Sequence, residues 1–163
     1  MKYLLPREGQ FYKANLHSHS TCSDGRFTPE ELKEMYTERG YSIIAYTDHN
    51  ALCPQNHLTD EHFLALNGLE VGLGEFPKGD PRYDIRRNCD IGLIAPDPLF
   101  RGSLGHQQYT GQYNPVAVNA IMKTYREAGF FVIHNHPGWS MERYTYGTQI
   151  ALLCQLEIDG KPV

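Results

Sequence analysis

The fold is decided by residues 28–50, which read TPEELKEMYTERGYSIIAYTDHN. Thr28 and Glu31 have the spacing of a capping box, in which each side chain bonds the backbone N–H of the other residue at the start of a helix. Gly40 ends that helix, because glycine readily takes the backbone conformation found after a helix. The apolar run 42–47 follows at once and predicts a strand. Together with a strand predicted before the helix, these elements form a βαβ unit and indicate an α/β fold.

A second helix is predicted at residues 115–128, with Asn114 as its N-cap and Gly129 at its end. Its apolar stripe indicates core packing. The apolar strand 130–133 follows directly. Over the whole chain we expect five or six strands and three or four helices, within one domain spanning residues 1–163.

The turn after the first predicted strand carries two histidines and an aspartate. The alternating residues 11–16 predict that strand, and His17 and His19 come directly after it. Side chains two residues apart in a strand point to the same side, so both imidazoles project together. A turn rich in Ser and Gly then brings Asp24 back beside them. Two imidazoles and a carboxylate suit a borderline divalent ion such as Zn, Mn or Fe.

Three further apolar runs end in side chains of the same kinds. Asp48 and His49 follow the second predicted strand, Glu70 follows a short apolar run, and His134 and His136 follow the last strand. In α/β barrels and open sheets, sites are built at the carboxyl ends of the strands. The concentration of histidines at strand ends therefore predicts one clustered metal site.

In this order along the chain, the motifs resemble those of PHP (polymerase and histidinol phosphatase) domains, and most of all their stand-alone metal-dependent phosphoesterases. The resemblance runs from about Lys13 to Asp159 and rests on four motifs: His17-x-His19 with Asp24, Thr47-Asp48-His49, Gly68-Leu69-Glu70 and His136-Pro137. It implies a distorted (β/α)7 barrel that hydrolyses phosphate esters. It also implies two or three bound divalent ions, Mn, Fe or Zn, with Mg as a further candidate.

The resemblance implies a role for each matching side chain. His17 and His19 resemble ligands of a first metal, Glu70 the carboxylate that bridges two metals, His136 a ligand of the second metal, and Asp24 and His49 ligands of a third. Asp48 is expected to orient His49 or a bound water. His134 is expected on the same side as His136, either as the acid for the leaving group or as a hydrogen-bonded neighbour. The candidate catalytic residues are Glu70, His134 and Asp48.

Two features depart from the family pattern. Where the family supplies another histidine at a strand end, residues 89–95 offer Asp90, either as a ligand that favours harder metals or as a residue at the start of a strand. The closing Asp-x-His motif of the family does not occur after His136, and the chain stops at Val163. We therefore expect a fragment truncated at its C-terminus, with an incomplete barrel whose open edge favours self-association.

Residues 72–111 are rich in Gly, Pro and Arg and predict a long binding loop or lid. An arginine there, with Arg101 as the candidate, has the fork geometry to clamp a substrate phosphate. Most arginines of this stretch are expected to be solvated. Trp139, the only tryptophan, is a candidate wall of the substrate pocket, although packing within its loop is the commoner role.

Composition narrows the function classes. The 163 residues are 40% hydrophobic and 21% charged, as in soluble globular proteins. A net charge of −4 argues against strong electrostatic binding of nucleic acid. No apolar run approaches the ~20 residues that a membrane span needs. Four scattered cysteines without a CxxC pair predict free thiols and a cytoplasmic location.

The expected function is hydrolysis of a phosphomonoester, either a nucleotide or a small metabolite, by a metal-activated water. One alternative is a non-catalytic truncated module that binds metal or a protein. Another is a C–N hydrolase of the amidohydrolase type, which also begins with His-x-His but needs a metal-bridging lysine on a middle strand. No lysine follows an apolar run here, since Lys78 lies in a Gly/Pro loop.

Overall fold

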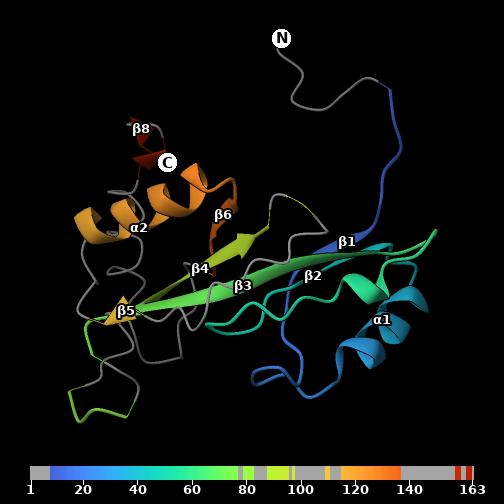
Figure 1. Ribbon diagram of the computed structural model, residues 1–163, viewed down its shortest axis with the longest axis horizontal. Helices are drawn as coiled ribbons and strands as arrows, with labels where there is room; N and C mark the ends of the chain where they lie inside the picture. The colour runs from blue at the N-terminus through green and yellow to red at the C-terminus, as the bar shows by residue number, and fades with distance from the viewer. Residues whose placement is uncertain are drawn as a thin grey trace.

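The computed structural model describes residues 8–76, 79–82, 88–95, 97, 109–110, 115–136, 157–158 and 161–162. Its helices are α1 (Pro29–Thr37) and α2 (Pro115–Glu127), with a short 3₁₀ helix, η1, at Asn56–Leu58. Its strands are β1 (Ala14–Ser18), β2 (Ile43–Tyr46), β3 (Leu64–Gly74), β4 (Asn88–Ile94), β5 (Tyr109–Thr110), β6 (Phe131–His134), β7 (Glu157–Ile158) and β8 (Lys161–Pro162) (Figure 1).

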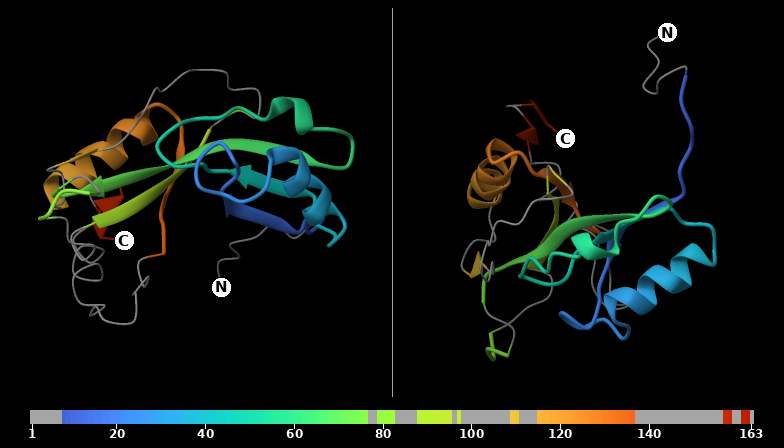
Figure 2. Two further views of the ribbon diagram at one scale, coloured as in Figure 1. Left: turned by 90° about the horizontal axis from the view of Figure 1, so that it is seen from below. Right: turned by 45° about the vertical axis from the view of Figure 1, so that its right-hand side comes forward.

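In the described part of the chain, five strands form a curled mixed sheet in the order β1-β2-β3-β4-β6, and β5 adds to β3. β1, β2 and the first part of β3 are parallel, whereas β4 runs antiparallel to both β3 and β6. β3 joins the two halves, because residues 64–67 pair with β2 and residues 68–74 pair with β4. Figures 1 and 2 show β3 running from beside α1 to beside α2. The result has the form of half a barrel, and β7 and β8 pair separately.

The alternation of side chains along β3 separates the core from the opposite face of the sheet. Ala65 packs in the apolar cluster around α1, and Leu69, Val71 and Leu73 pack in the cluster around α2. These four side chains are at most 1% exposed. Because Glu70 lies between them in the strand, its side chain points to the other face. The two apolar clusters therefore pack against one face of β3, and the Glu70 side chain lies on the opposite face.

Both predicted helices form close to where the sequence places them. The capping box is confirmed: Thr28 Oγ1 accepts from the Glu31 N–H at 3.2 Å, and the Glu31 carboxylate accepts from the Thr28 N–H at 2.8 Å. Gly40 and Gly129 have φ values of +76° and +91°, which glycine adopts without strain after a helix. The buried residues of α2 are Val118, Met122 and Tyr125. Asn114 lies outside the described residues.

The sheet differs from the sequence-based expectations in three respects. β1 begins three residues later than the predicted strand, at Ala14, because its pairing with β2 begins there. The stretch 72–111 is not one long loop, since β3 continues to Gly74 and the stretch also contains β4 and β5. β4 is antiparallel, whereas each strand of a (β/α) repeat runs parallel to its neighbours. The complete seven-stranded barrel stays a prediction.

Cys22, Cys53 and Cys89 are free thiols, as the sequence predicts, and Cys154 lies outside the described residues. Within the described ranges, no helix combines the length and the apolar character that crossing a membrane requires.

Candidate metal centre

Glu70 lies at the centre of a cluster of histidines and carboxylates, near the point where β3 leaves β2 and begins to pair with β4. Its N–H donates to the Asp48 carbonyl at 3.0 Å, and its carbonyl accepts from the Asn50 N–H at 2.7 Å. These bonds hold the segment after β2 against β3, so His49 pairs with Glu70 across an isolated bridge. The Glu70 residue is only 1% exposed, and a carboxylate so buried needs charged or hydrogen-bonding neighbours.

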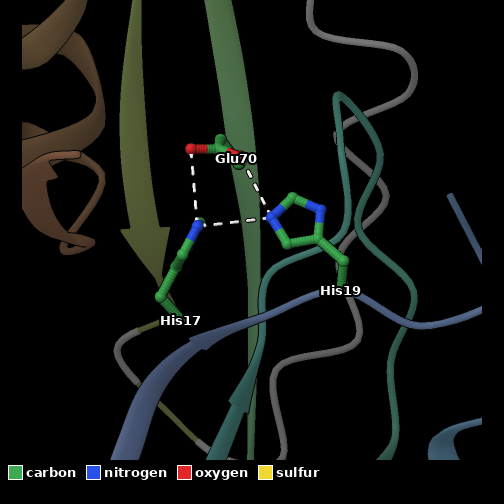
Figure 3. Close-up of side chains that lie close together, drawn as sticks. All are labelled: His17, His19 and Glu70. Atoms are coloured by element: carbon green, nitrogen blue, oxygen red, sulfur yellow. Dashed lines mark hydrogen bonds and ion pairs between the residues drawn. The ribbon is translucent and has the colours of Figure 1, made fainter. Parts of the chain in front are cut away.

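The two carboxylate oxygens of Glu70 face different side chains. Oε1 lies 2.7 Å from Asn135 Nδ2, 2.9 Å from His136 Nε2 and 3.7 Å from His17 Nε2. Oε2 lies 3.1 Å from His19 Nε2 and 3.4 Å from His49 Nδ1. Figure 3 shows His17 and His19 approaching the carboxylate together, one toward each oxygen. One buried carboxylate is thus shared by side chains that lie at or just after the ends of three different strands.

Asp48 holds the turn that carries Asp24. The buried Asp48 carboxylate accepts from the Ser20 N–H at 2.7 Å, the Ser20 hydroxyl at 2.9 Å and the Ser23 hydroxyl at 2.8 Å. These bonds fold the turn back, and Asp24 Oδ1 lies 3.1 Å from His19 Nδ1. The structure therefore shows Asp48 positioning this turn, whereas the sequence predicts that it orients the histidine next to it or a water.

Asp90 lies on the face of the cluster because its neighbours in β4, Cys89 and Ile91, both pack in the core on the other face. The strand register puts Asp90 opposite Gly72. Because Gly72 lies two residues after Glu70 in β3, the Asp90 side chain shares a face of the sheet with Glu70. Burial, and then the charge of Glu70, raise the pKa of Asp90 to about 6. Asp90 is thus both a residue at the start of a strand and a carboxylate within reach of the cluster.

The end of β6 differs from the predicted geometry. The register puts His134 opposite Ile91, on the core face of the sheet, whereas Asn135 and His136 both contact Glu70. His136 has a φ of +25°, which interrupts the alternation and turns its ring toward the carboxylate. The expectation that His134 and His136 share a side was therefore wrong. Both ring nitrogens of His134 are buried without a hydrogen-bond partner among the described residues, and burial lowers the pKa of this ring.

The charges of the cluster are organised around Glu70. Burial alone would raise the pKa of Glu70, but hydrogen bonds from His136, His19 and Asn135 outweigh it and hold the pKa far below its ordinary value. The same bonds to Glu70 raise the pKa values of His19 and His136. Burial instead lowers the pKa of His17. An ionised carboxylate among several imidazoles suits a divalent cation, which binds the neutral form of histidine.

Three sets of residues could each hold a metal ion, because the ligand atoms within each set lie within 4.8 Å of one another. The sets are His17, His19 and Glu70; His19, Asp24 and His49; and Glu70, Asp90 and His136. In the second set, His49 Nε2 lies 3.5 Å from Asp24 Oδ2. His19 Nδ1 is buried and lies 3.1 Å from Asp24 Oδ1 without making a hydrogen bond, as expected where two ligands share a cation. These imidazoles and carboxylates fit Zn, Mn or Fe, while metal identity and number stay predictions.

The structure brings together every predicted metal-ligand candidate, but it describes neither substrate-binding candidate. Arg101 and Trp139 lie outside the described residues. Thr47 and Asn135 contact the cluster, although neither was predicted to have a role there. Thr47 belongs to the Thr-Asp-His motif, and Asn135 stands between two histidines. Position inside a motif was the available signal for both.

Among curated proteins, this chain is similar to parts of two enzymes. It is 46% identical over 108 residues to the DNA polymerase/3'-5' exonuclease PolX of Bacillus subtilis (strain 168), a match covering 54% of this chain and 19% of that protein. It is 40% identical over 63 residues to the 5'-3' exoribonuclease Rnm of Escherichia coli (strain K12), covering 35% of this chain and 22% of that protein. No family model matches the chain. The matched region is about a fifth of each relative, and both matches are consistent with a relationship to the PHP family.

Proposed function

We propose that this chain forms the metal-binding part of a phosphoesterase, which hydrolyses phosphate esters with bound divalent ions. The observation that carries the proposal is the buried Glu70 carboxylate, whose two oxygens face separate groups of imidazoles. A carboxylate in this position has two oxygens to share between two cations. The names of both relatives, an exonuclease and an exoribonuclease, support hydrolysis of a phosphate ester.

The side chains of the cluster supply ligands and control protons around the substrate phosphate. Divalent ions, when bound, lower the pKa of a water toward ~7 and offset negative charge on phosphate oxygens. The low pKa of Glu70 keeps this carboxylate ionised. Asp90, whose pKa is raised to about 6, must lose its proton to bind a cation, and His19 and His136 must be neutral. Metal affinity is therefore expected to rise with pH.

Two classes of phosphate ester are candidate substrates. The motifs favour a phosphomonoester, either a nucleotide or a small phosphorylated metabolite. The names of PolX and Rnm favour a second candidate, the terminal phosphodiester of a nucleic-acid strand. The net charge of −4 opposes strong binding to a nucleic-acid backbone, so we place the small phosphomonoester first.

The alternatives make different predictions. A non-catalytic module would take up metal without turning over any phosphate ester. A C–N hydrolase of the amidohydrolase type would need a bridging lysine on a middle strand, and neither β3 nor β4 contains a lysine. We therefore keep the non-catalytic module as the main competing proposal.

The test is turnover of para-nitrophenyl phosphate, a monoester, and bis(para-nitrophenyl) phosphate, a diester, by the chain loaded with Mn²⁺. The proposal expects metal-dependent hydrolysis of the monoester that is lost in Glu70→Gln. The matched control is His57→Ala, which removes an exposed histidine paired with Glu30 on the surface and should keep full activity. Preference for the diester would favour the nuclease-like substrate. Turnover that persists in Glu70→Gln would contradict the proposal.

A further inference from the structure

Thr47 follows β2 and contacts His17, a ligand candidate at the end of β1. We propose that Thr47 is a positioning residue that holds His17 in the tautomer protonated at Nδ1. The Nε2 lone pair is then directed toward Glu70 and is free to bind a divalent cation. The functional consequence rests on the proposed metal site, whereas the tautomer itself does not.

Three contacts of the Thr47 hydroxyl determine where its proton goes. Thr47 is 1% exposed, and its Oγ1 lies 3.1 Å from the Ser18 nitrogen, 3.3 Å from the Ser18 carbonyl oxygen and 3.0 Å from His17 Nδ1. A hydroxyl has one proton and two lone pairs. The Ser18 N–H occupies one lone pair, and the Ser18 carbonyl takes the proton because it can only accept. His17 Nδ1 faces the remaining lone pair, and we assign it as the donor of this hydrogen bond.

The other nitrogen of the ring leads to the same tautomer. His17 Nε2 lies 3.3 Å from His19 Nε2, and His19 Nε2 is 3.1 Å from Glu70 Oε2, to which it donates. A proton on His17 Nε2 would face this N–H, and Glu70 Oε1 at 3.7 Å is beyond normal hydrogen-bond reach. A lone pair at His17 Nε2 avoids both problems.

Asn135 does not reverse this assignment. Its Nδ2 donates one proton to Glu70 Oε1 at 2.7 Å, and its second proton would have to reach His17 Nδ1 over the longer distance of 3.4 Å. The contact between Thr47 and His17 is also the shorter of the two at Nδ1. Thr47 therefore sets the protonation of this nitrogen.

The arrangement places Thr47 rigidly behind the ligand. The Thr47 N–H donates to the Ser18 carbonyl at 2.8 Å, so the hydroxyl is anchored to the end of β1 that carries His17. A histidine binds metal through its unprotonated nitrogen, and a hydrogen bond at the other nitrogen fixes the tautomer and the direction of the ring. Removing such a bond typically lowers metal affinity ~10–100-fold.

The test compares Thr47→Val, which removes the hydroxyl at similar size, with Thr47→Ser, which keeps it. Nitrogen NMR of metal-free protein with isotope-labelled histidine, at about pH 8.5 where ordinary imidazoles are neutral, shows which ring nitrogen carries the proton. His17→Gln assigns the signals. A Co²⁺ titration followed by visible absorbance measures affinity without any turnover. We expect the Nδ1-protonated tautomer in the wild type and Thr47→Ser, and its loss in Thr47→Val with ~10–100-fold weaker Co²⁺ binding.

The matched control is Ser18→Ala, which removes the hydrogen bond from the Ser18 hydroxyl to the Ala45 carbonyl at 2.8 Å. It weakens the same strand pair but leaves the Thr47 hydroxyl in contact with His17, so tautomer and affinity should not change. A wild-type His17 protonated at Nε2, or an unchanged tautomer and affinity in Thr47→Val, would overturn the inference. A wild type with the Nδ1 tautomer that binds no Co²⁺ would support the tautomer assignment and contradict the proposed function instead.

Discussion

Replacing Asp90 by asparagine should stabilise the metal-free protein at neutral pH while weakening its affinity for divalent ions. Burial, and then the charge of Glu70, raise the pKa of Asp90 from 3.8 to about 6. The folded state therefore binds more protons than the unfolded state between these values, and the free energy of unfolding falls as the pH rises through this range. A difference of about two pKa units corresponds to about 3 kcal/mol. This is an upper limit, because Asp90 is only partly buried.

Asparagine has nearly the same shape and no charge to bury. Asp90→Asn should thus gain up to about 3 kcal/mol above about pH 6 and almost nothing below about pH 4. Urea unfolding of chelator-treated wild type and variant across this pH range measures the difference. Added Mn²⁺ should reverse the order, because the wild type binds the ion more tightly. A variant that is no more stable than the wild type at about pH 8 would refute the reasoning.

Three further substitutions test the surroundings of the cluster. In Gly92→Ala, the added Cβ would lie 2.6 Å from Asn135 Oδ1 and push this amide away from Glu70; weaker Co²⁺ binding is expected, and unchanged binding would contradict the role of the amide. Leu93→Ala, at a fully buried core position, should lower the free energy of unfolding by about 2–5 kcal/mol in urea, with unchanged Co²⁺ affinity of the folded protein. Asp48→Asn removes the charge from a carboxylate that accepts three hydrogen bonds, so the free energy of unfolding should fall by about 1.5–3 kcal/mol. Amide hydrogen exchange in the turn after β1 should become faster, and unchanged slow exchange would contradict the role of Asp48 in holding this turn.

The unit formed by α1 and β2 could be predicted because its signals are local. The capping box of Thr28 and Glu31 acts within one helical turn, and Gly40 acts at the residue where it stands. His17 and His19 come together for the same reason, since two residues at the end of one strand need no distant contact to share a side.

The direction of β4 and the geometry after β6 depend on distant contacts, so the sequence could not supply them. Asp90 lies opposite Gly72, close to Glu70, through the register of β4 on the second half of β3, and this pairing is not local. His136 turns back through a positive φ that no local pattern indicates for a histidine. The function of Asn135 likewise depends on Glu70, which is 65 residues away.

The most direct test of the account is the number of transition-metal ions bound per chain, measured by elemental mass spectrometry on protein purified without chelator. Glu70 belongs to two of the three candidate ligand sets. The account therefore predicts two or more equivalents of Mn, Fe or Zn in the wild type and in His57→Ala, and clearly fewer in Glu70→Gln. A wild type that carries no metal, and takes up none on reconstitution with each ion, would contradict it.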